Sequence, residues 1–546
     1  MGGVTVIDRA TEPTPTRRTR LLRDNLSVAT GTAVGRVTGF VKVLALFVAL
    51  EGGLRDAYQL ANNAPNIIFE LILGGVLTAT LVPLFTDDLL HGDDEATSAV
   101  VSTALVALVA VTGLTFVVSP GLIWLYSLNH AAGVSPGELR SVGTNLAFFF
   151  APQVFFYGAM ALGSALLNAR RRFFAAAWAP VLENLIVIAM LLTIPLVFPG
   201  HRDLERAARD GGLRAYLGIG TTLSIVVMAV VLLPVLRRAG VHIRLRPSLR
   251  HPAVRRAMRL SGWTIGYVVA NQVAAFVVLV LAKPGTGNVT DYQTAFTFFQ
   301  LPHGLLAVSL MTTFQPDLAR SASVGDEPGF NRRLLLGLRL LGLVVIPAAV
   351  GYLVVTHTFV DGMRHAHVTL ARFDLLSILP ILGGFALGLV GFSAYLFILR
   401  AFYARTDTRT PFYLNLVENA LNIVFALLLV GRFGVMGLAI AYALAYSVAA
   451  VVSFVVLTRR LDDFDVRGLV DTLVRLLGAA AVMAFVAWVI AGAVQGAGWA
   501  PVLLSLLVTI GAGIATYAAA VLVLRVPEQL GGLGALSAGR GRTRRR

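Results

Sequence analysis

The sequence predicts an all-α polytopic membrane protein with about 14 transmembrane helices, in two six-helix lobes around a central cavity plus a C-terminal helix pair. Composition is the first indication, because the 546 residues are 57% hydrophobic and only 14% charged. The mean hydropathy of +0.78 is far from that of a soluble globular chain. Apolar segments of about 20 residues, the length that crosses a bilayer core, recur from Leu26 to Leu524. A faint internal repeat favours two related lobes.

The apolar segments and the polar breaks between them place each expected helix. The predicted ranges are 25–50, 57–86, 96–118, 139–168, 174–198, 214–236, 254–283, 290–316, 331–356, 374–402, 410–430, 434–458, 470–494 and 500–525. The domains that follow are a basic N-terminus 1–24, an N-lobe 25–237, a basic linker 238–253, a C-lobe 254–460, a helix pair 461–525 and a basic tail 526–546.

The net charge of +16 indicates orientation in the membrane and not a nucleic-acid partner. Most of the 45 Lys and Arg residues fall on one side of the predicted helices, in the N-terminus, Arg170–Arg172, the stretch 237–259 and the tail. The positive-inside rule then puts both termini in the cytoplasm, with the chain in a bacterial inner membrane. A nucleic-acid surface would need one basic stripe with aromatic residues, and here the charge is spread over short loops beside the lipid bilayer.

Signals of an enzyme are missing from the sequence. There is no cysteine, so thiolate chemistry, iron–sulfur clusters and Cys-ligated zinc are excluded. The chain also lacks a phosphate-binding Gly-rich loop, an HExxH pair and a nucleophile elbow, and its nine histidines show no metal-ligand spacing. We expect no catalytic residue, no metal and no organic cofactor.

The repeat rests on two pairs of segments. Pro180 is followed by Asn184, and Pro411 is followed by Asn415, four residues on in both cases. NAPNIIFELILGGVLTATLVPLF in the second predicted helix has a counterpart in QLPHGLLAVSLMTTFQPDL in the eighth, and both contain two prolines. Related halves are common in transporters, where the substrate site lies between them.

Two cations in the first predicted helix are the strongest candidates for a substrate site. Arg36 and Lys42 both lie within GRVTGFVKVLALF, and six residues at 100° each place them about 120° apart around the helix. Ionisable groups inside apolar helices by default mark a pathway or a binding site. The alternative for Arg36 is a side chain that snorkels to the cytoplasmic surface. Lys42 lies deeper and is harder to explain in that way.

A polar stripe follows in the second predicted helix. Asn63, Asn66 and Glu70 recur at offsets of three and four, with Asn62 beside them. Pro65 inside the stripe breaks the backbone hydrogen-bond pattern. A functional interpretation puts Glu70 near the cations of the first helix in a water-filled cavity. The alternative is an interhelical hydrogen-bond seam that only holds helices together.

Further polar residues inside predicted helices are spread over both lobes. Glu418 with Asn422 one turn later is a candidate site for a coupled monovalent cation. The others are Gln153, Glu183, Asn184, Asn271, Gln272, Gln300 and Asn419.

The first two predicted helices resemble the start of the MurJ/MviN family in three stretches: GRVTGFVKV, RDAYQL and NAPNIIFELILGGVLTATLVP. Members of this family are the lipid II flippases of the multidrug/oligosaccharidyl-lipid/polysaccharide exporter superfamily. Two later family motifs also have similar stretches here, LLNARRRFFAAAWAP and FYARTDTRTP. The similarity therefore runs from about residue 25 to 460. The matching residues of the first stretches are Arg36, Gly39, Phe40, Asp56, Ala57, Pro65, Asn66, Gly75, Val82 and Pro83.

The resemblance implies a flippase that moves lipid II, an undecaprenyl- or polyprenyl-pyrophosphate-linked glycan, by alternating access. It implies no ATP, with drive from the membrane potential or a coupled monovalent cation, and work beside the cell-wall synthesis machinery. The pyrophosphate would lie against Arg36 and Lys42, and Asp56 would serve an external gate or a helix-end contact. The residues expected to bind substrate are Arg36, Lys42, Asp56, Asn63, Asn66 and Glu70, and those with structural or gating roles are Gly39, Pro65, Gly75 and Pro83.

The sequence departs from the family pattern mainly in its cations. Lys42 replaces an arginine, Asn63 stands where a basic residue is common, and Phe69 and Glu70 replace two arginines. Two alternatives therefore stay open: an exporter of another polyprenyl-linked saccharide, and a non-transporting scaffold of the cell-wall machinery.

Overall fold

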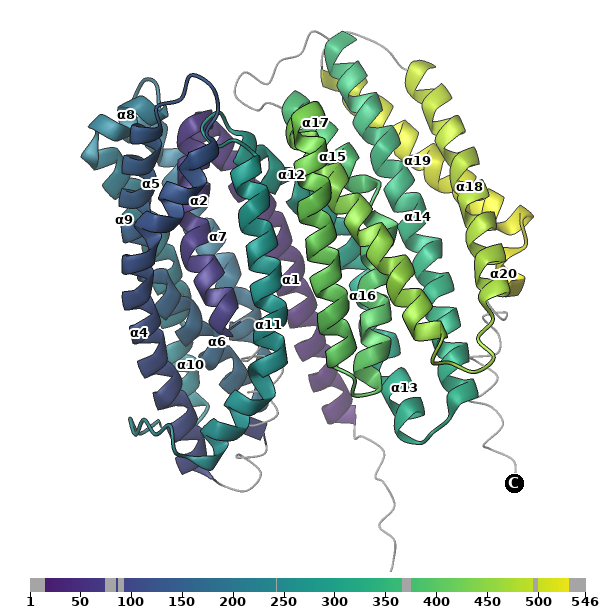
Figure 1. Ribbon diagram of the computed structural model, residues 1–546, viewed down its shortest axis with the longest axis horizontal. Helices are drawn as coiled ribbons and strands as arrows, with labels where there is room; N and C mark the ends of the chain where they lie inside the picture. Colours follow the sequence, from purple (N-terminus) through teal and green to yellow (C-terminus); the bar gives the residue numbers. More distant parts are fainter. Residues whose placement is uncertain are drawn as a thin grey trace, which may run out of the picture. The chain divides into compact units, whose positions relative to one another are not determined.

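The computed structural model describes residues 15–73, 85–86, 93–241, 243–365, 375–493 and 499–529. These residues form helices and connecting loops, and no strand occurs among them (Figure 1). They group into two compact units. Unit 1 comprises the residues up to Leu50, Ala61–Gly121 and Val142–Gly262, and unit 2 comprises Glu51–Leu60, Leu122–Ser141 and the residues from Trp263.

Unit 1 contains the helices of the first half of the chain. Three of these helices contribute residues to unit 2, namely Gly52–Leu60 of α2, Leu122–Tyr126 of α4 and Pro136–Ser141 of α5. The bounds are α1 Pro15–Ala49, α2 Gly52–Leu73, α4 Asp94–Tyr126, α5 Pro136–Phe150, α6 Gln153–Ala169, α7 Phe173–Val197, α8 Leu204–Arg209, α9 Gly211–Val230 and α10 Leu232–Arg238.

A ladder of glycines lets α1 approach α7 closely. Gly31, Gly35 and Gly39 recur every four residues and so share one face of α1. A Cβ added at Gly31 would lie 3.0 Å from the Trp178 ring, and one added at Gly39 would lie 3.7 Å from the amide nitrogen of Asn184. Small residues at such spacing are typical of tightly packed membrane helices. The ladder therefore sets which α7 side chains meet α1.

Unit 2 contains the remaining helices, and Pro252–Gly262 of its first helix belong to unit 1. A π-helical turn, η3, joins two of them. The bounds are α11 Pro252–Leu281, α12 Asn288–Pro302, η3 His303–Ala307, α13 Val308–Ser323, α14 Glu327–His365, α15 Leu375–Ala386, α16 Leu389–Ala404, α17 Arg409–Thr458, α18 Val466–Ala493, α19 Trp499–Val523 and α20 Val526–Gln529.

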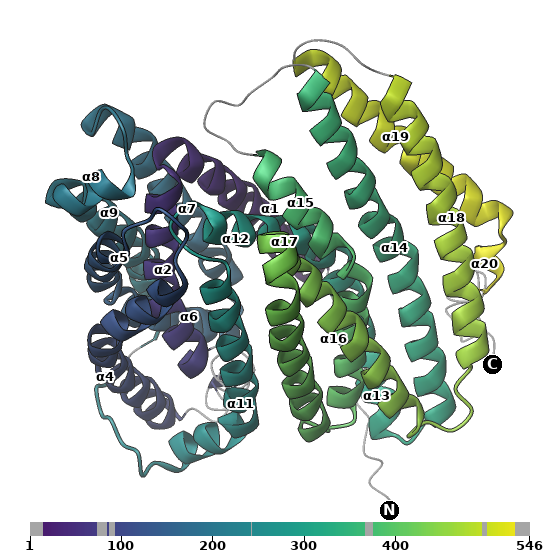
Figure 2. The same ribbon diagram turned by 45° about the horizontal axis from the view of Figure 1, so that its top comes forward.

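The last two long helices pack on α14, as Figures 1 and 2 show. Their buried cluster includes Ile346 of α14, Leu476 and Met483 of α18, and Tyr517 of α19. The hydroxyl of Tyr517 donates a 3.0 Å hydrogen bond to the carbonyl of Leu343. This bond satisfies the buried phenol hydroxyl of Tyr517, and α18 and α19 belong to unit 2.

Several expected helices are interrupted in the structure. The expected helix 290–316 changes to a π turn directly after Pro302, and the expected helix 374–402 is split into α15 and α16, which are bent by 48°. The predicted break between 410–430 and 434–458 occurs at Gly434, whose φ of 56° lies in the left-handed region within α17. Proline and glycine are the ordinary causes of such kinks.

The described helices suit a bilayer as solvent. Nine of them are long and apolar enough to cross a membrane, or ten if α15 and α16 count as one span. Large apolar side chains lie open on their surfaces, such as Leu196 at 81% and Val523 at 79% exposure. A surface of this kind is stable against lipid and costly against water. The count of about 14 spans stays a prediction.

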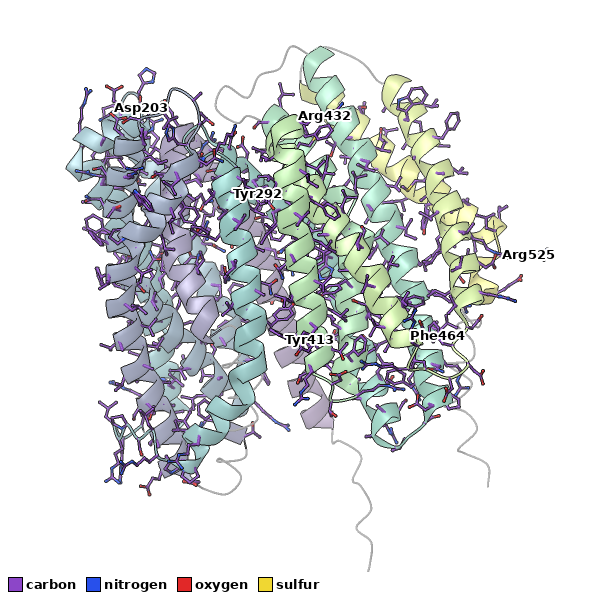
Figure 3. The ribbon with its side chains drawn as sticks, in the orientation of Figure 1. Asp203, Tyr292, Tyr413, Arg432, Phe464 and Arg525 are labelled. Carbon is purple, nitrogen blue, oxygen red and sulfur yellow. The ribbon has the colours of Figure 1, made fainter. Side chains whose placement is uncertain are left out.

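One end of unit 2 carries a group of ion pairs. Asp407, in the turn between α16 and α17, lies 2.8 Å from the guanidinium of Arg460. Arg405 pairs with Glu327 at the start of α14. Tyr413 and Phe464 lie toward this end, and Arg432 lies toward the other end of the first half of α17 (Figure 3). The paired charges thus mark one polar surface of the unit.

Candidate functional site

Lys42 of α1 forms an ion pair with Glu183 of α7 inside unit 1. Its Nζ lies 3.2 Å from Oε1 and 3.4 Å from Oε2 of that carboxylate. The Lys42 side chain is 34% exposed and that of Glu183 is 12% exposed. A lone charge within an apolar helix is costly, so Glu183 explains how α1 tolerates the lysine. The side chain of Glu70, the carboxylate expected beside these cations, lies outside the described side chains.

Arg36 is half-buried, one and a half turns before Lys42 on α1. Among the residues that the structure describes, its guanidinium forms no ion pair. Arginine donates up to five hydrogen bonds in a planar fork and matches a phosphate bidentately. A phosphate contact at Arg36 stays a prediction, which these donors suit.

Asn184 ties α7 to α1 directly beside the ion pair. Its Nδ2 donates to the carbonyl of Gly35 and to the hydroxyl of Thr38, both at 3.2 Å. Neighbouring residues of α7 thus have different roles. Asn184 holds the two helices together by neutral hydrogen bonds, and Glu183 supplies the charge.

The polar stripe of α2 is half-buried where it is described. Pro65 lies inside the helix. Among the described residues, Oδ1 of Asn62 and Nδ2 of Asn63 are buried without a hydrogen-bond partner. Buried amide groups without partners are uncommon and ask for a ligand, water or a conformational change. Asn66 lies on the same helix, half-buried, whereas Gly75 and Pro83 fall outside the described residues.

Asp56 is fully buried at the start of α2 and caps α12 in unit 2. Its carboxylate accepts hydrogen bonds from the N–H of Gly285 at 2.9 Å, of Gly287 at 2.8 Å and of Thr290 at 3.0 Å. The hydroxyl of Thr290 donates a fourth, also 3.0 Å long. These N–H groups precede or open α12, where a helix has unpaired donors and a positive dipole end. Asp56 therefore makes a helix-end contact.

Glycines build the loop that surrounds this carboxylate. Gly285 and Gly287 have φ of +120° and +104°, which side chains rarely adopt. A Cβ added at Gly52 would lie 2.4 Å from the carbonyl oxygen of Thr286. Sequence reasoning selected Asp56 and missed its partners. The available signal was the run KPGTGN, a glycine turn directly before a helix.

A second group of polar residues lies inside unit 2 on α17. Glu418 is only 1% exposed. Within the described residues, neither of its carboxylate oxygens accepts a hydrogen bond of good geometry, although the phenol of Tyr446 lies beside them. Oδ1 of Asn422, one turn later, is likewise buried and unpartnered among the described residues. Three acceptor oxygens without donors suit a cation or a proton.

Three asparagines join α17 to α11 close to Glu418 in the sequence. Oδ1 of Asn271 accepts from Nδ2 of Asn415 and from Nδ2 of Asn419, both at 3.2 Å. Asn419 also donates to the carbonyl of Asn415 at 2.9 Å. The network uses amide groups alone, so it holds the helices without placing a charge in the core.

The two units repeat one arrangement. Asn184 follows Pro180 by four residues and binds α1, the first helix of unit 1. Asn415 follows Pro411 by four residues and binds α11, the first long helix of unit 2. The repeat read from the sequence thus has a structural counterpart, an asparagine that bonds a helix of the same unit.

Sequence reasoning did not select His303. Its ring is buried in the π turn η3, with Nδ1 2.9 Å from the hydroxyl of Ser393 and the ring 4.6 Å from that of Phe392. The only signal was a histidine after Pro302 in an apolar run. π turns often occur at functional sites, and here the turn joins α12 to α13.

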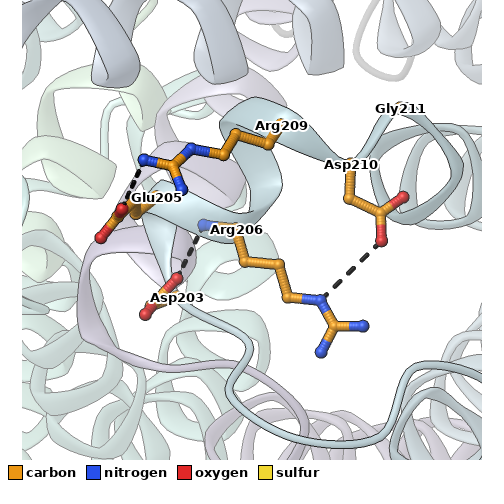
Figure 4. A pocket seen from close by; sticks show the side chains of 6 residues that line it. All are labelled: Asp203, Glu205, Arg206, Arg209, Asp210 and Gly211. Atoms are coloured by element: carbon orange, nitrogen blue, oxygen red, sulfur yellow. Dashed lines mark hydrogen bonds and ion pairs between the residues drawn. The ribbon is translucent and has the colours of Figure 1, made fainter.

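A pocket of about 480 Å³ lies around the short helix α8 and the start of α9 (Figure 4). Its charged residues pair with one another: Arg209 with Glu205 at 2.7 Å, and Arg206 with Asp210 at 3.8 Å. Asp203 accepts from the N–H of Arg206 at 2.8 Å and caps the helix. The charged side chains of the pocket therefore pair with one another and serve as structural contacts of an exposed loop.

Comparison with known proteins identifies the family of this chain. The family model described as lipid II flippase MurJ matches residues 50–510. A probable lipid II flippase MurJ from Vibrio cholerae serotype O1 is 26% identical over 539 residues, which cover 93% of this chain and 97% of the relative. The lipid II flippase MurJ of Burkholderia cenocepacia is 26% identical over 482 residues, 85% of this chain and 89% of the relative.

Solved structures show the same fold. A structure of lipid II flippase MurJ in an inward closed conformation matches with a TM-score of 0.71 at 19% identity, over 92% of this chain and 99% of that one. An inward-facing multidrug resistance MATE family transporter of the MOP superfamily matches with a TM-score of 0.62 at 14% identity, over 78% of this chain and 94% of that one. Because the family model covers most of the sequence, the chain belongs to the MurJ family of multi-pass membrane transporters.

Proposed function

We propose that this chain translocates lipid II from the cytoplasmic to the outer leaflet by alternating access. The observation that carries the proposal is the match of the MurJ model over residues 50–510, together with curated relatives that bear the name lipid II flippase. Alternating access in transporters moves two lobes around a fixed substrate site. The work is transport without a change in covalent bonds, so no catalytic residue is required.

The anionic headgroup binds the cations of α1 in this proposal. Arg36 grips the pyrophosphate bidentately, and Lys42 adds a point charge. Asn63 and Asn66 of α2 supply amide donors and acceptors that suit the sugar hydroxyls. Glu70 shares the face of these asparagines by its sequence position. The lipid tail stays in the bilayer, where its burial costs nothing.

Asp56 serves an external gate in this proposal. Its four hydrogen bonds link the start of α2 to the start of α12. Release of the substrate outward requires these bonds to break and α12 to lose its cap. Gly39 and Pro65 permit the required changes in helix packing, Gly39 by its small size and Pro65 by its missing N–H.

The energy for transport comes from the membrane potential or a coupled monovalent cation. Glu418 and Asn422 present three buried oxygens without donors among the described residues, which is the ligand type that such a cation prefers. We place both termini in the cytoplasm and the chain in the bacterial inner membrane, because the basic loops then face inward. There it would work beside the cell-wall synthesis machinery.

Complementation tests the proposal. A strain depleted of its own lipid II flippase should be rescued by this chain, whereas Arg36→Ala and Lys42→Ala should each abolish rescue at equal expression. Lys283→Ala is the matched control, because this exposed lysine lies in the loop before α12 and should still rescue. Rescue by both the Arg36→Ala and the Lys42→Ala variants would contradict the binding site. Failure of the wild-type chain would favour export of another polyprenyl-linked saccharide or a scaffold role.

A further inference from the structure

The Lys42–Glu183 pair places a carboxylate where an anionic substrate would have to bind. The proposed function assigns Lys42 to the headgroup, yet its ammonium already contacts both carboxylate oxygens of Glu183, at 3.2 and 3.4 Å. We propose that Glu183 is a specificity-determining residue that competes with the substrate phosphate for Lys42. This inference rests on the proposed function and adds a selection by headgroup charge.

The exposure of the two side chains leaves room for a second anion at Lys42. The lysine side chain is 34% exposed and the glutamate 12%, so Lys42 is the more accessible partner of the pair. A lysine ammonium carries three donors, and the two oxygens of Glu183 do not exhaust them. A phosphate can therefore approach Lys42 while the carboxylate is still in place, and then draw the ammonium away from it.

The backbone of α7 cannot move to take Glu183 away from Lys42. The next residue, Asn184, donates to Gly35 and Thr38 of α1 at 3.2 Å each. Gly39 of α1 also lies close to this turn of α7. A Cβ added at Gly39 would lie 3.7 Å from Nδ2 of Asn184. The carboxylate therefore stays near Lys42 while α1 and α7 remain packed, and only side-chain rotation can move it.

Because of this competition, a ligand binds Lys42 well only if its headgroup is more negatively charged than the Glu183 carboxylate. The carboxylate carries one negative charge, so a ligand with a single phosphate gains little when it replaces Glu183. A pyrophosphate spreads more charge over two groups and can engage Arg36 and Lys42 together, which lie about 120° apart around α1. Glu183 thus favours pyrophosphate-linked over monophosphate-linked lipids and lowers the affinity for both.

Binding to the full chain in lipid nanodiscs tests this inference, with undecaprenyl pyrophosphate and undecaprenyl phosphate as probes and undecaprenol as the uncharged control. Glu183→Gln should bind the monophosphate about tenfold more tightly and the pyrophosphate about threefold more tightly, so that the preference between them shrinks. Lys42→Gln should weaken binding of both. The double variant should resemble Lys42→Gln, because the effect of Glu183 requires the lysine.

Asn184→Ala is the matched control for helix packing. It breaks the neighbouring α1–α7 hydrogen bonds without a change of charge, so it should lower thermal stability and leave the ratio of the two affinities unchanged. If Glu183→Gln does not fold, Glu183→Asp keeps the charge but draws it back by one methylene, and should narrow the preference to a smaller extent. An unchanged affinity ratio in a folded Glu183 variant would overturn the inference. A wild-type chain that binds neither phosphate probe would contradict the proposed function instead.

Discussion

The carboxylate of Asp56 accepts two hydrogen bonds from Thr290, one from its N–H and one from its hydroxyl, each 3.0 Å long, although the residues lie 234 positions apart. Both atoms are buried, so the bonds are not shared with water. Gly285 and Gly287 complete the set of donors. A buried carboxylate held by four donors is a strong local constraint, and the first prediction begins from it.

Removal of the Asp56 cap should destabilise the protein strongly. Asp56→Ala leaves four buried donors without an acceptor, so we expect the free energy of unfolding to fall by about 3 kcal/mol. Thr290→Val removes only the hydroxyl donor and should cost about 1 kcal/mol. Denaturation of the purified protein in detergent measures both. Equal stability of Asp56→Ala and wild type would show that the cap does not hold α12.

The asparagine network should behave as a unit. Asn271→Leu removes the acceptor that Asn415 and Asn419 share, and we expect a loss of about 1 kcal/mol. Asn415→Leu should cost a similar amount, but the double variant less than the sum, because the shared bond is lost only once. A double-mutant cycle on unfolding in mixed micelles gives the coupling. Strict additivity would mean that the amides do not interact.

Glu418 should matter for transport and not for stability. Its carboxyl group is buried without a hydrogen bond of good geometry among the described residues, so Glu418→Gln removes a buried ionisable group and should keep or raise the unfolding temperature. The same variant should lose rescue of a flippase-depleted strain. Asp317→Asn, at an exposed site of α13, is the control that should retain rescue. A Glu418→Gln chain that rescues normally would contradict coupling at this residue.

The stability of the α16–α17 turn should depend on pH. Burial raises the pKa of Asp407, but hydrogen bonds from Thr410 and the pair with Arg460 outweigh this effect and leave the pKa below its usual value. An aspartate with a lowered pKa contributes stability above its unfolded pKa of about 3.9, and the contribution is lost as the pH falls through the folded pKa. Asp407→Asn should therefore be less stable than wild type at neutral pH and similar near pH 3. A difference that persists at acid pH would contradict this assignment.

The all-helical membrane fold could be predicted from the sequence, whereas the count of spans and the roles of the polar residues stay predictions. Hydropathy located the spans because each must fill the bilayer with apolar side chains. Gly434 ended one helix as expected, since only a residue without Cβ adopts its left-handed backbone easily. The sequence also indicated a repeat, because Asn184 and Asn415 each follow a proline by four residues.

The partners of these polar residues were not readable from the sequence. Lys42 pairs with Glu183, 141 positions away, because the glycine face of α1 lets α7 pack closely against this part of α1. Helical periodicity reports which residues share a face, and it does not report which helix packs there. The π turn at His303 and the bend between α15 and α16 were missed for the same reason. His303 in the π turn contacts Ser393 of α16, 90 positions away, and such a partner is not visible in the sequence.

Translocation of lipid II by the purified chain in proteoliposomes tests the central claim most directly. Labelled lipid II in the inner leaflet would be followed as it becomes accessible to a membrane-impermeant reagent outside, with and without an imposed membrane potential. We expect wild-type chain to move lipid II, and Arg36→Ala and Lys42→Ala to reduce the rate at least tenfold, with Lys283→Ala unaffected. Wild-type vesicles that translocate lipid II no faster than protein-free vesicles, at either potential, would contradict the account.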